Sequence, residues 1–260
     1  MIFPDIDPVA LSLGPLEIRW YALAYLAGFV GGWRLCMRLV RGRAAPPLPQ
    51  NYDDFLVWAV IGTVLGGRLG YVLIYNLPHY FDAPLDALQV WHGGMAFHGG
   101  MMGVIIAALL YTRKHKIPFW RFTDPLAVVT PIGLFFGRLA NFINGELFGR
   151  VTDVPWGVVF PYGGPEPRHP SQLYQAGMEG LILFAVLMFL IRKTDWQNRS
   201  GLASGVFLAG YGIARIVGEF FRQPDPQLGF LFSGATMGQL LSLPMVALGA
   251  WLIYRAKKPQ

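Results

Sequence analysis

The 260-residue sequence contains little charge and a single cysteine. Only 14% of its residues are charged whereas 54% are hydrophobic, and its mean hydropathy is positive. A soluble domain carries about 25% charged residues, so this composition argues against a soluble protein and predicts one polytopic membrane domain spanning 1–260. The lone Cys36 excludes an internal disulfide and a cysteine-rich metal site, and its apolar setting predicts a packing role.

Several catalytic motifs are missing as well. There is no His-Glu-x-x-His motif for zinc, no cysteine cluster, and no glycine loop ending in Lys-Ser or Lys-Thr that would hold nucleotide phosphates. Ser204 lacks the glycine two residues earlier that an intramembrane serine protease would show. We therefore expect neither metal-dependent nor serine hydrolysis, and no metal or other cofactor. The acids and prolines of the first eight residues lead us to expect no cleaved signal peptide.

Apolar segments long enough to cross about 30 Å of hydrocarbon occur seven times. They are residues 18–37, 54–75, 95–112, 124–145, 171–191, 200–221 and 235–254. Most lysines and arginines follow the first, third, fifth and seventh of these segments, which predicts an outside amino terminus and a cytoplasmic carboxyl terminus. The same clustering accounts for the net charge of +6 without a nucleic-acid partner. The fold class expected is therefore all-α, with about seven spans around a polar cavity in the outer half of the bilayer.

Two outer loops stand out between these spans. Residues 76–94 contain no lysine or arginine, and their aromatic residues suit the membrane interface. Residues 146–170 form the longest loop, rich in glycine, proline and aromatics, and we expect them to fold as an extracytoplasmic flap.

Residues 137–149 place a cation, two amides and a carboxylate within apolar sequence. At about 100° per residue, Arg138, Asn141 and Gly145 fall on one helix face, with Asn144 about 60° away. An ionisable group at membrane depth is costly, which makes Arg138 a candidate functional residue. The alternative is a structural arginine that hydrogen-bonds carbonyl groups and holds helices together.

The sixth segment repeats this pattern. Tyr211, Arg215, Glu219 and Arg222 are spaced by four, four and three residues and lie within about 80° of arc. From about 1.5 Å of rise per residue, Arg138 and Arg215 reach a similar depth in the outer half of the bilayer. An ion pair between Arg215 and Glu219 is the structural alternative. Two arginines in one outward-facing cavity instead predict a site for a phospholipid phosphate, because guanidinium groups match phosphate oxygens.

Three further polar residues could have either a functional or a structural role. His98 lies between glycine pairs that permit close backbone approach, and an imidazole can take a proton near neutral pH, although a lone histidine is more often structural. Arg68 is a third candidate for the anion, but its glycine-rich setting favours close helix packing. His169 precedes Pro170 at the start of the fifth segment, which favours a capping or interface role.

Residues 137–149 resemble the signature of the bacterial prolipoprotein diacylglyceryl transferases. The likeness extends in family order to most of the chain, through Trp20-Tyr21, residues 93–100, residues 168–174 and the Tyr211, Arg215, Glu219, Arg222 face. The resemblance implies a bacterial cytoplasmic (inner) membrane enzyme. It would move the diacylglyceryl group of phosphatidylglycerol onto the lipobox cysteine of a preprolipoprotein, releasing glycerol phosphate. Ala96 departs from the serine of many relatives and puts any hydroxyl role at that position in doubt.

The resemblance also implies roles for particular residues. Arg138 would bind phosphatidylglycerol, and the substrate-binding residues would also include Asn141, Glu146, Gly149, Arg215, Glu219 and Arg222. The catalytic residues would be Tyr21, His98, Arg138, Tyr211 and Arg215. A free thiol is a weak nucleophile until deprotonated, so our hypothesis is that His98 accepts its proton while Tyr21 or Tyr211 orients the headgroup. The rival function is an anion transporter or lipid flippase. The inner halves of the predicted spans are apolar, which argues against it.

Overall fold

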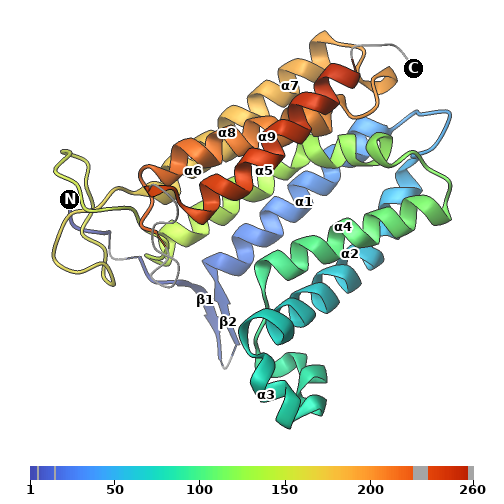
Figure 1. Cartoon of the computed structure of the whole chain (residues 1–260). Helices are drawn as coiled ribbons and strands as arrows, with labels where there is room; N and C mark the ends of the chain where they lie inside the picture. The colour runs from blue at the N-terminus through green and yellow to red at the C-terminus, as the bar shows by residue number, and fades with distance from the viewer. Residues whose placement is uncertain (5, 15, 225–233, 257–260) are drawn as a thin grey trace. The chain divides into compact units, whose positions relative to one another are not determined.

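The computed structural model describes residues 1–4, 6–14, 16–224 and 234–256. The chain divides into two compact units, one of residues 1–39 and 123–260, the other of residues 40–122 (Figure 1). We describe each unit by itself; the prediction of a single domain over 1–260 stays a prediction.

The first unit is built of helices preceded by a small hairpin. Its helical elements are α1 (Trp20–Val40), α5 (Phe119–Ile143), α6 (Ser171–Gln175), η4 (Ala176–Ile182), α7 (Leu183–Lys193), η5 (Trp196–Asn198), α8 (Leu202–Glu219) and α9 (Met237–Arg255). α6, the π-helical η4 and α7 follow one another without a break, so the fifth predicted span is one continuous rod. Short π-helical segments inside helices are frequently found at functional sites.

A buried carboxylate joins two helices of this unit. Asp124 near the start of α5 is 2% exposed and accepts backbone N–H bonds from Gly201, at 2.7 Å, and Ser204, at 2.8 Å. The Ser204 hydroxyl donates to the same carboxylate at 2.8 Å. The first turn of a helix has no internal acceptors for its N–H groups, so Asp124 caps α8 from outside that helix.

The second unit is centred on two antiparallel helices, α2 (Pro49–Gly70) and α4 (Phe97–Lys114), which lie side by side (Figure 1). The segment of the chain that connects α2 to α4 contains four short helical elements: η1 (Tyr71–Tyr75), α3 (Leu77–Asp82), η2 (Pro84–Leu88) and η3 (Val90–His92). Glycines at steps of four on both helices let the backbones touch: a Cβ at Gly62 would lie 2.6 Å from the Gly103 carbonyl oxygen. Cβ atoms at Gly66 and Gly99 would collide with each other's carbonyl oxygens. Small residues at this spacing are the usual device for close helix packing in membranes.

Within the part of the chain that the structure describes, five helices are long and apolar enough to cross a membrane. They are Trp20–Val40, Pro49–Ile74, Phe119–Ile143, Ser171–Lys193 and Met237–Arg255, and each overlaps a predicted span. The chain is thus a mainly helical, multi-pass membrane protein. The other two predicted spans, 95–112 and 200–221, coincide with α4 and α8, which are 18 residues long and contain charged residues that lower their hydropathy.

The all-α expectation misses a hairpin before α1. Strands β1 (Val9–Leu13) and β2 (Leu16–Arg19) pair antiparallel. Leu11 and Leu13 are more than half exposed, so the hairpin has no core of its own. A two-stranded hairpin is marginal in isolation, and its short strands have no long hydrophobic pattern by which to be recognised.

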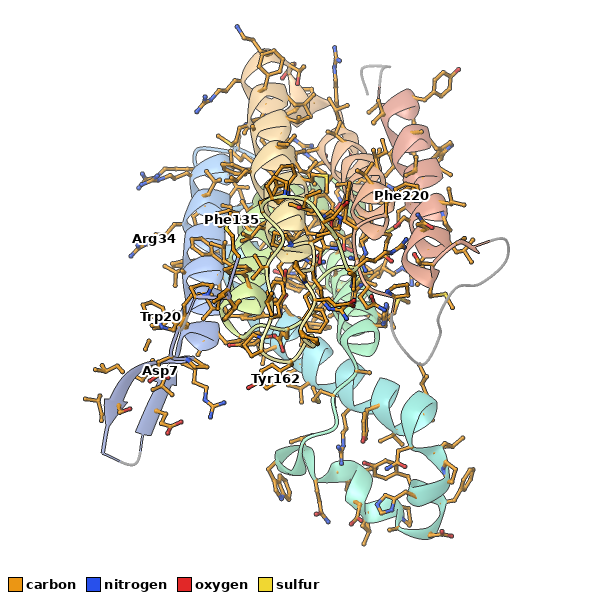
Figure 2. The ribbon with its side chains drawn as sticks, turned by 90° about the vertical axis from the view of Figure 1, so that its left-hand side faces the viewer. Asp7, Trp20, Arg34, Phe135, Tyr162 and Phe220 are labelled. Atoms are coloured by element: carbon orange, nitrogen blue, oxygen red, sulfur yellow. The ribbon has the colours of Figure 1, made fainter. Side chains whose placement is uncertain are left out.

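The flap of residues 146–170 is folded by backbone pairing. Val151 and Val158 both form bridges with Arg168, and Gly149 pairs with Arg222 beyond the end of α8. The Arg168 guanidinium donates to the Gly163 carbonyl at 2.7 Å and lies over the Phe148 ring. Tyr162, labelled in Figure 2, is 81% exposed. These contacts fold the loop on itself, and its extracytoplasmic location stays a prediction.

Candidate active site

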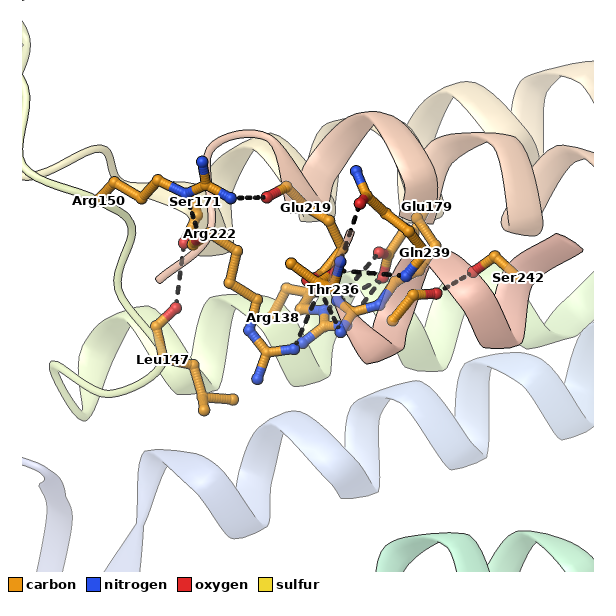
Figure 3. Close-up of polar contacts among 12 residues, drawn as sticks. Arg138, Leu147, Arg150, Ser171, Glu179, Glu219, Arg222, Thr236, Gln239 and Ser242 are labelled. Carbon is orange, nitrogen blue, oxygen red and sulfur yellow. Dashed lines mark hydrogen bonds and ion pairs between the residues drawn. The ribbon is translucent and has the colours of Figure 1, made fainter. Parts of the chain in front are cut away.

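A buried ion pair joins α5 to η4 (Figure 3). Arg138 donates from Nε and Nη2 to the Oε2 atom of Glu179, at 3.2 and 3.0 Å. The Glu179 side chain is 0% exposed and that of Arg138 16% exposed. The two elements approach closely because Gly180 has no side chain; a Cβ there would lie 2.7 Å from Cβ of Phe135.

α8 brings a second arginine to the same carboxylate. Arg215 Nη1 lies 4.0 Å from Glu179 Oε1, while its Nη2 lies 2.7 Å from Glu219 Oε1. The Arg215–Glu219 ion pair, which was the structural alternative, is therefore present, and Arg138 and Arg215 both contact Glu179. Arg222 Nη1 contacts the same Glu219 oxygen at 3.3 Å, although α8 ends at Glu219 and Arg222 lies beyond it.

These residues form what we call the charge cluster, defined as Arg138, Glu179, Arg215, Glu219 and Arg222. Three guanidinium groups face two carboxylates, which leaves one net positive charge. The three arginine side chains are each 13 to 16% exposed, so this charge is largely shielded from solvent. A cationic site that is mostly buried but still partly accessible is suited to bind one anion. It would bind that anion strongly, because solvent and salt screen the electrostatic attraction only weakly there.

Glu179 was missed by the sequence reasoning. The sequence does contain a signal for it, because Glu179 is the one acid within residues 171–191, an otherwise apolar predicted span. Arginines in an apolar span predict anion binding directly, whereas an acid there acts through the arginines it contacts.

Glu219 packs against the first turn of α9. A Cβ at Gly238 would lie 2.8 Å from the Cδ and Oε1 atoms of Glu219, so any side chain there would collide with the carboxylate. The N-terminus of a helix attracts negative charge, which gives Glu219 a second stabilising partner besides the two arginines.

Tyr211 lies one turn before Arg215 on α8. Its phenol interacts electrostatically with Glu179, Arg215, Arg138 and Arg222, and its ring stacks on Phe207 at 5.9 Å. Tyr211 is thus beside the charge cluster, as the predicted face requires. Its role in orienting a headgroup stays a prediction.

Tyr21 belongs to a different cavity of the same unit. Together with Pro8, Arg19, Asn144 and Glu146 it lines a space of about 410 Å³. Its hydroxyl lies 3.1 Å from that of Tyr25 one turn later. Polar residues from the hairpin, α1 and the end of α5 therefore surround this cavity, which contains none of the five cluster residues.

The end of α5 differs from the predicted helix face. α5 ends at Ile143, and Gly145 adopts a left-handed conformation with φ of 64°. The N–H of Gly145 donates to the Phe142 carbonyl at 2.9 Å and that of Glu146 to the Asn141 carbonyl at 3.0 Å. This is a Schellman motif, in which glycine at the left-handed position stops the helix. Gly145 is therefore a helix terminator, and the prediction that it shares the face of Arg138 and Asn141 is wrong.

Because Gly145 ends α5 with a turn of the backbone, the Glu146 side chain lies at the end of that helix. Its carboxylate accepts hydrogen bonds from the amides of Asn141, at 2.8 Å, and Asn144, at 3.4 Å. Gln172 at the start of α6 donates to the Glu146 carbonyl at 2.6 Å. Asn141 and Glu146, both predicted to bind substrate, thus contact one another; the binding role stays a prediction.

Gly149 sits where the flap crosses the end of α8. A Cβ there would lie 2.5 Å from the Phe221 carbonyl oxygen and 2.6 Å from that of His169, so only glycine fits. The next residue, Arg150, donates to the carbonyls of Glu219 and Arg222, each at 3.0 Å. These contacts attach the flap to the segment that carries Glu219 and Arg222, and they leave no room for a side chain at position 149.

His98 and Arg68 both belong to the second unit. His98 is an exposed residue in the first turn of α4. Arg68 is 6% exposed and donates to four backbone carbonyls, those of Asp86, Ala87, Gly93 and Gly94. Arg68 is therefore a structural arginine that holds the loop leading to α4, which agrees with the packing role favoured for it above.

His169 packs at the start of α6. Its ring contacts those of Tyr174 and Phe221, and its Nδ1 lies 3.2 Å from the Tyr174 hydroxyl. Burial lowers the pKa of His169 below its ordinary value, and the Asp153 carboxylate offsets part of this effect. The predicted interface role of His169 agrees with these contacts.

We expect the flap to lose stability as the pH falls. A histidine whose pKa is lower in the folded protein binds its proton more readily when unfolded, so acidification below about pH 6.5 favours local unfolding. Hydrogen exchange of residues 149–169, corrected for intrinsic rates, should be faster at pH 5.5 than at pH 7.5. His169→Gln should remove most of this difference; an unchanged difference in that variant would assign it to another group.

Comparison with known proteins places these observations in a family. A sequence model described as prolipoprotein diacylglyceryl transferase matches residues 8–255. A phosphatidylglycerol-prolipoprotein diacylglyceryl transferase of Azospirillum brasilense is 59% identical over 98% of this chain and 96% of its own length. Relatives of the same name from Rhodospirillum centenum and Paramagnetospirillum magneticum are each 56% identical, over 98% and 99% of this chain and 93% and 98% of their own lengths. The chain therefore belongs to the prolipoprotein diacylglyceryl transferase family.

Proposed function

We propose that this chain transfers the diacylglyceryl group of phosphatidylglycerol to the lipobox cysteine of a preprolipoprotein, the first step of bacterial lipoprotein maturation. The observation that carries this proposal is the charge cluster, in which Arg138 and Arg215 from different helices meet on Glu179 and leave one net positive charge. Family membership over nearly the whole chain supplies the reaction.

The reaction forms a bond from the cysteine sulfur to the terminal glyceryl carbon while the bond from that carbon to the phosphate oxygen breaks. The electron pair leaves with the phosphate, so negative charge builds on the departing glycerol phosphate. Preorganised guanidinium groups in a poorly solvated site stabilise such charge. Arg138 and Arg215 are proposed to do this, and Glu219 and Arg222 to hold Arg215 in place. Tyr211 orients the headgroup in this proposal.

The other predicted substrate contacts belong to the flap side of the first unit. Asn141 and Glu146 are proposed to contact substrate through the hydrogen-bonded end of α5, with Tyr21 lining the adjoining cavity. Gly149 contributes by allowing the flap to cross α8 closely. No cofactor enters this mechanism.

The membrane arrangement is also a proposal. α4 and α8 join the five apolar helices to give seven spans, with the amino terminus outside, the carboxyl terminus in the cytoplasm and the flap on the outer surface of the bacterial cytoplasmic membrane. The support is the distribution of lysine and arginine between alternate ends of the helices.

Purified protein in detergent tests the function directly. Phosphatidylglycerol and a peptide with a lipobox cysteine should yield a peptide heavier by one diacylglyceryl group, detected by mass spectrometry. Phosphatidylethanolamine serves as the control donor. Its ammonium group is repelled by the positive charge cluster, so we expect less transfer from it than from phosphatidylglycerol. Transfer from neither lipid, with phosphatidylglycerol still bound, would contradict the proposal.

His98 is proposed to accept the thiol proton. His98→Gln keeps a polar side chain but removes the base, and we expect transfer at pH 7 to fall about 100-fold, the lower end of general-base effects. Initial rates between pH 6 and pH 9 provide the measurement. Near-normal transfer across that range would contradict the assignment.

A further inference from the structure

Glu179 raises a question that binding by arginine alone does not answer. Its carboxylate is fully buried, and it lies between the two arginines proposed to hold the phosphate. We infer that Glu179 sets the net charge of the cluster so that a phosphodiester lipid is held and the phosphomonoester product is released. This inference rests on the proposed function and concerns the same site.

The geometry is not that of a saturated structural ion pair. Arg215 is already paired at 2.7 Å with Glu219, whose Oε1 atom it shares with Arg222, so Glu179 is not its closest ion-pair partner. Glu179 Oε1 and Arg215 Nη1, 4.0 Å apart, both lack a hydrogen-bond partner among the described residues. Leaving buried polar groups unpaired is costly, which indicates that Glu179 is retained for its charge and not for a complete set of hydrogen bonds.

The charge of the cluster matches the substrate better than the product. With Glu179 ionised the five residues of the charge cluster carry one net positive charge. A phosphodiester carries a single negative charge, which the cluster neutralises. A phosphomonoester carries about −1.5 to −2 at pH 7, more than the cluster neutralises.

The reaction itself produces this change. A thiolate and a phosphodiester monoanion give a neutral thioether and a phosphomonoester dianion, so both negative charges end on the leaving group. A cluster with two net positive charges would match that dianion and retain it. Glu179 prevents this by holding the cluster at one positive charge, at some expense in affinity for the lipid.

Glu179→Gln tests the inference because it removes the charge while keeping the shape. We expect glycerol phosphate to inhibit this variant at a concentration about tenfold lower than it inhibits the wild type, since one added unit of positive charge is weakly screened at a buried site. The KM for phosphatidylglycerol should fall or stay within about twofold, while kcat falls about tenfold because product release slows. Loss of folded enzyme alone would lower kcat without tightening inhibition.

Two further variants complete the test. Asp124→Asn removes another buried carboxylate of the same unit and should lower the melting temperature without changing inhibition by glycerol phosphate. Glu179→Asp keeps the charge but moves it one methylene from the arginines; it should tighten inhibition by less than Glu179→Gln does, and it decides the matter if the glutamine variant is not recovered folded. Unchanged inhibition in whichever Glu179 variant folds would overturn the inference. Absence of transfer by the wild type would instead contradict the proposed function.

Discussion

Arg138→Ala is expected to lower kcat for diacylglyceryl transfer about 1000-fold, at the upper end of the effect of removing one electrostatic stabiliser from an active site. The variant loses a cation that faces the developing phosphate charge. It also leaves Glu179 without its hydrogen bonds at 3.0 and 3.2 Å, and breaking a buried ion pair costs about 3 to 5 kcal/mol of stability. Transfer rates by mass spectrometry and melting temperatures measure the two effects separately.

Two control variants sharpen this prediction. Arg138→Lys keeps the charge but loses the planar fork that contacts Glu179, so we expect an intermediate loss of about 100-fold. Arg34→Ala removes an exposed arginine of α1, labelled in Figure 2, and should change transfer by no more than about twofold. An Arg138→Ala enzyme with more than about a tenth of wild-type kcat would contradict a role in stabilising the leaving group.

Gly103→Val is expected to disrupt the second unit. A Cβ at Gly103 would collide with the backbone carbonyl of Gly62 on α2, a group that cannot rotate away. Overpacking costs about 1 to 3 kcal/mol where side chains can adjust, so a backbone collision should lie at the upper end and lower the melting temperature by about 6 to 12 °C. Thermal unfolding in detergent provides the measurement.

The matched control lies on the same helix. A Cβ at Gly100 would meet Thr63 at 3.5 Å or more, an ordinary van der Waals distance. Gly100→Ala should therefore leave the melting temperature within about 2 °C of the wild type, while Gly103→Ala should already lower it. Equal effects of the two alanine variants would show that α2 and α4 are not held by close glycine contact.

The sequence by itself was sufficient for the helical membrane class, the location of five spans and the family. Apolar length and charge clustering are local properties, and the motifs around Arg138 and Arg215 are contiguous. The pairing of Arg215 with Glu219 was also predictable, because residues four apart on a helix are neighbours whatever surrounds them.

Only the tertiary structure decided which polar groups meet across helices. The helices are apolar on most sides, so no periodic pattern indicates which face of η4 turns toward α5 and α8, and Glu179 could not be assigned to the arginines. Arg68 and Arg138 look alike in sequence, yet one donates to four carbonyls and the other to a buried carboxylate. The physical reason is that a guanidinium group binds whichever acceptors packing brings within reach, and packing between helices depends on their rotation and register, which local sequence does not encode.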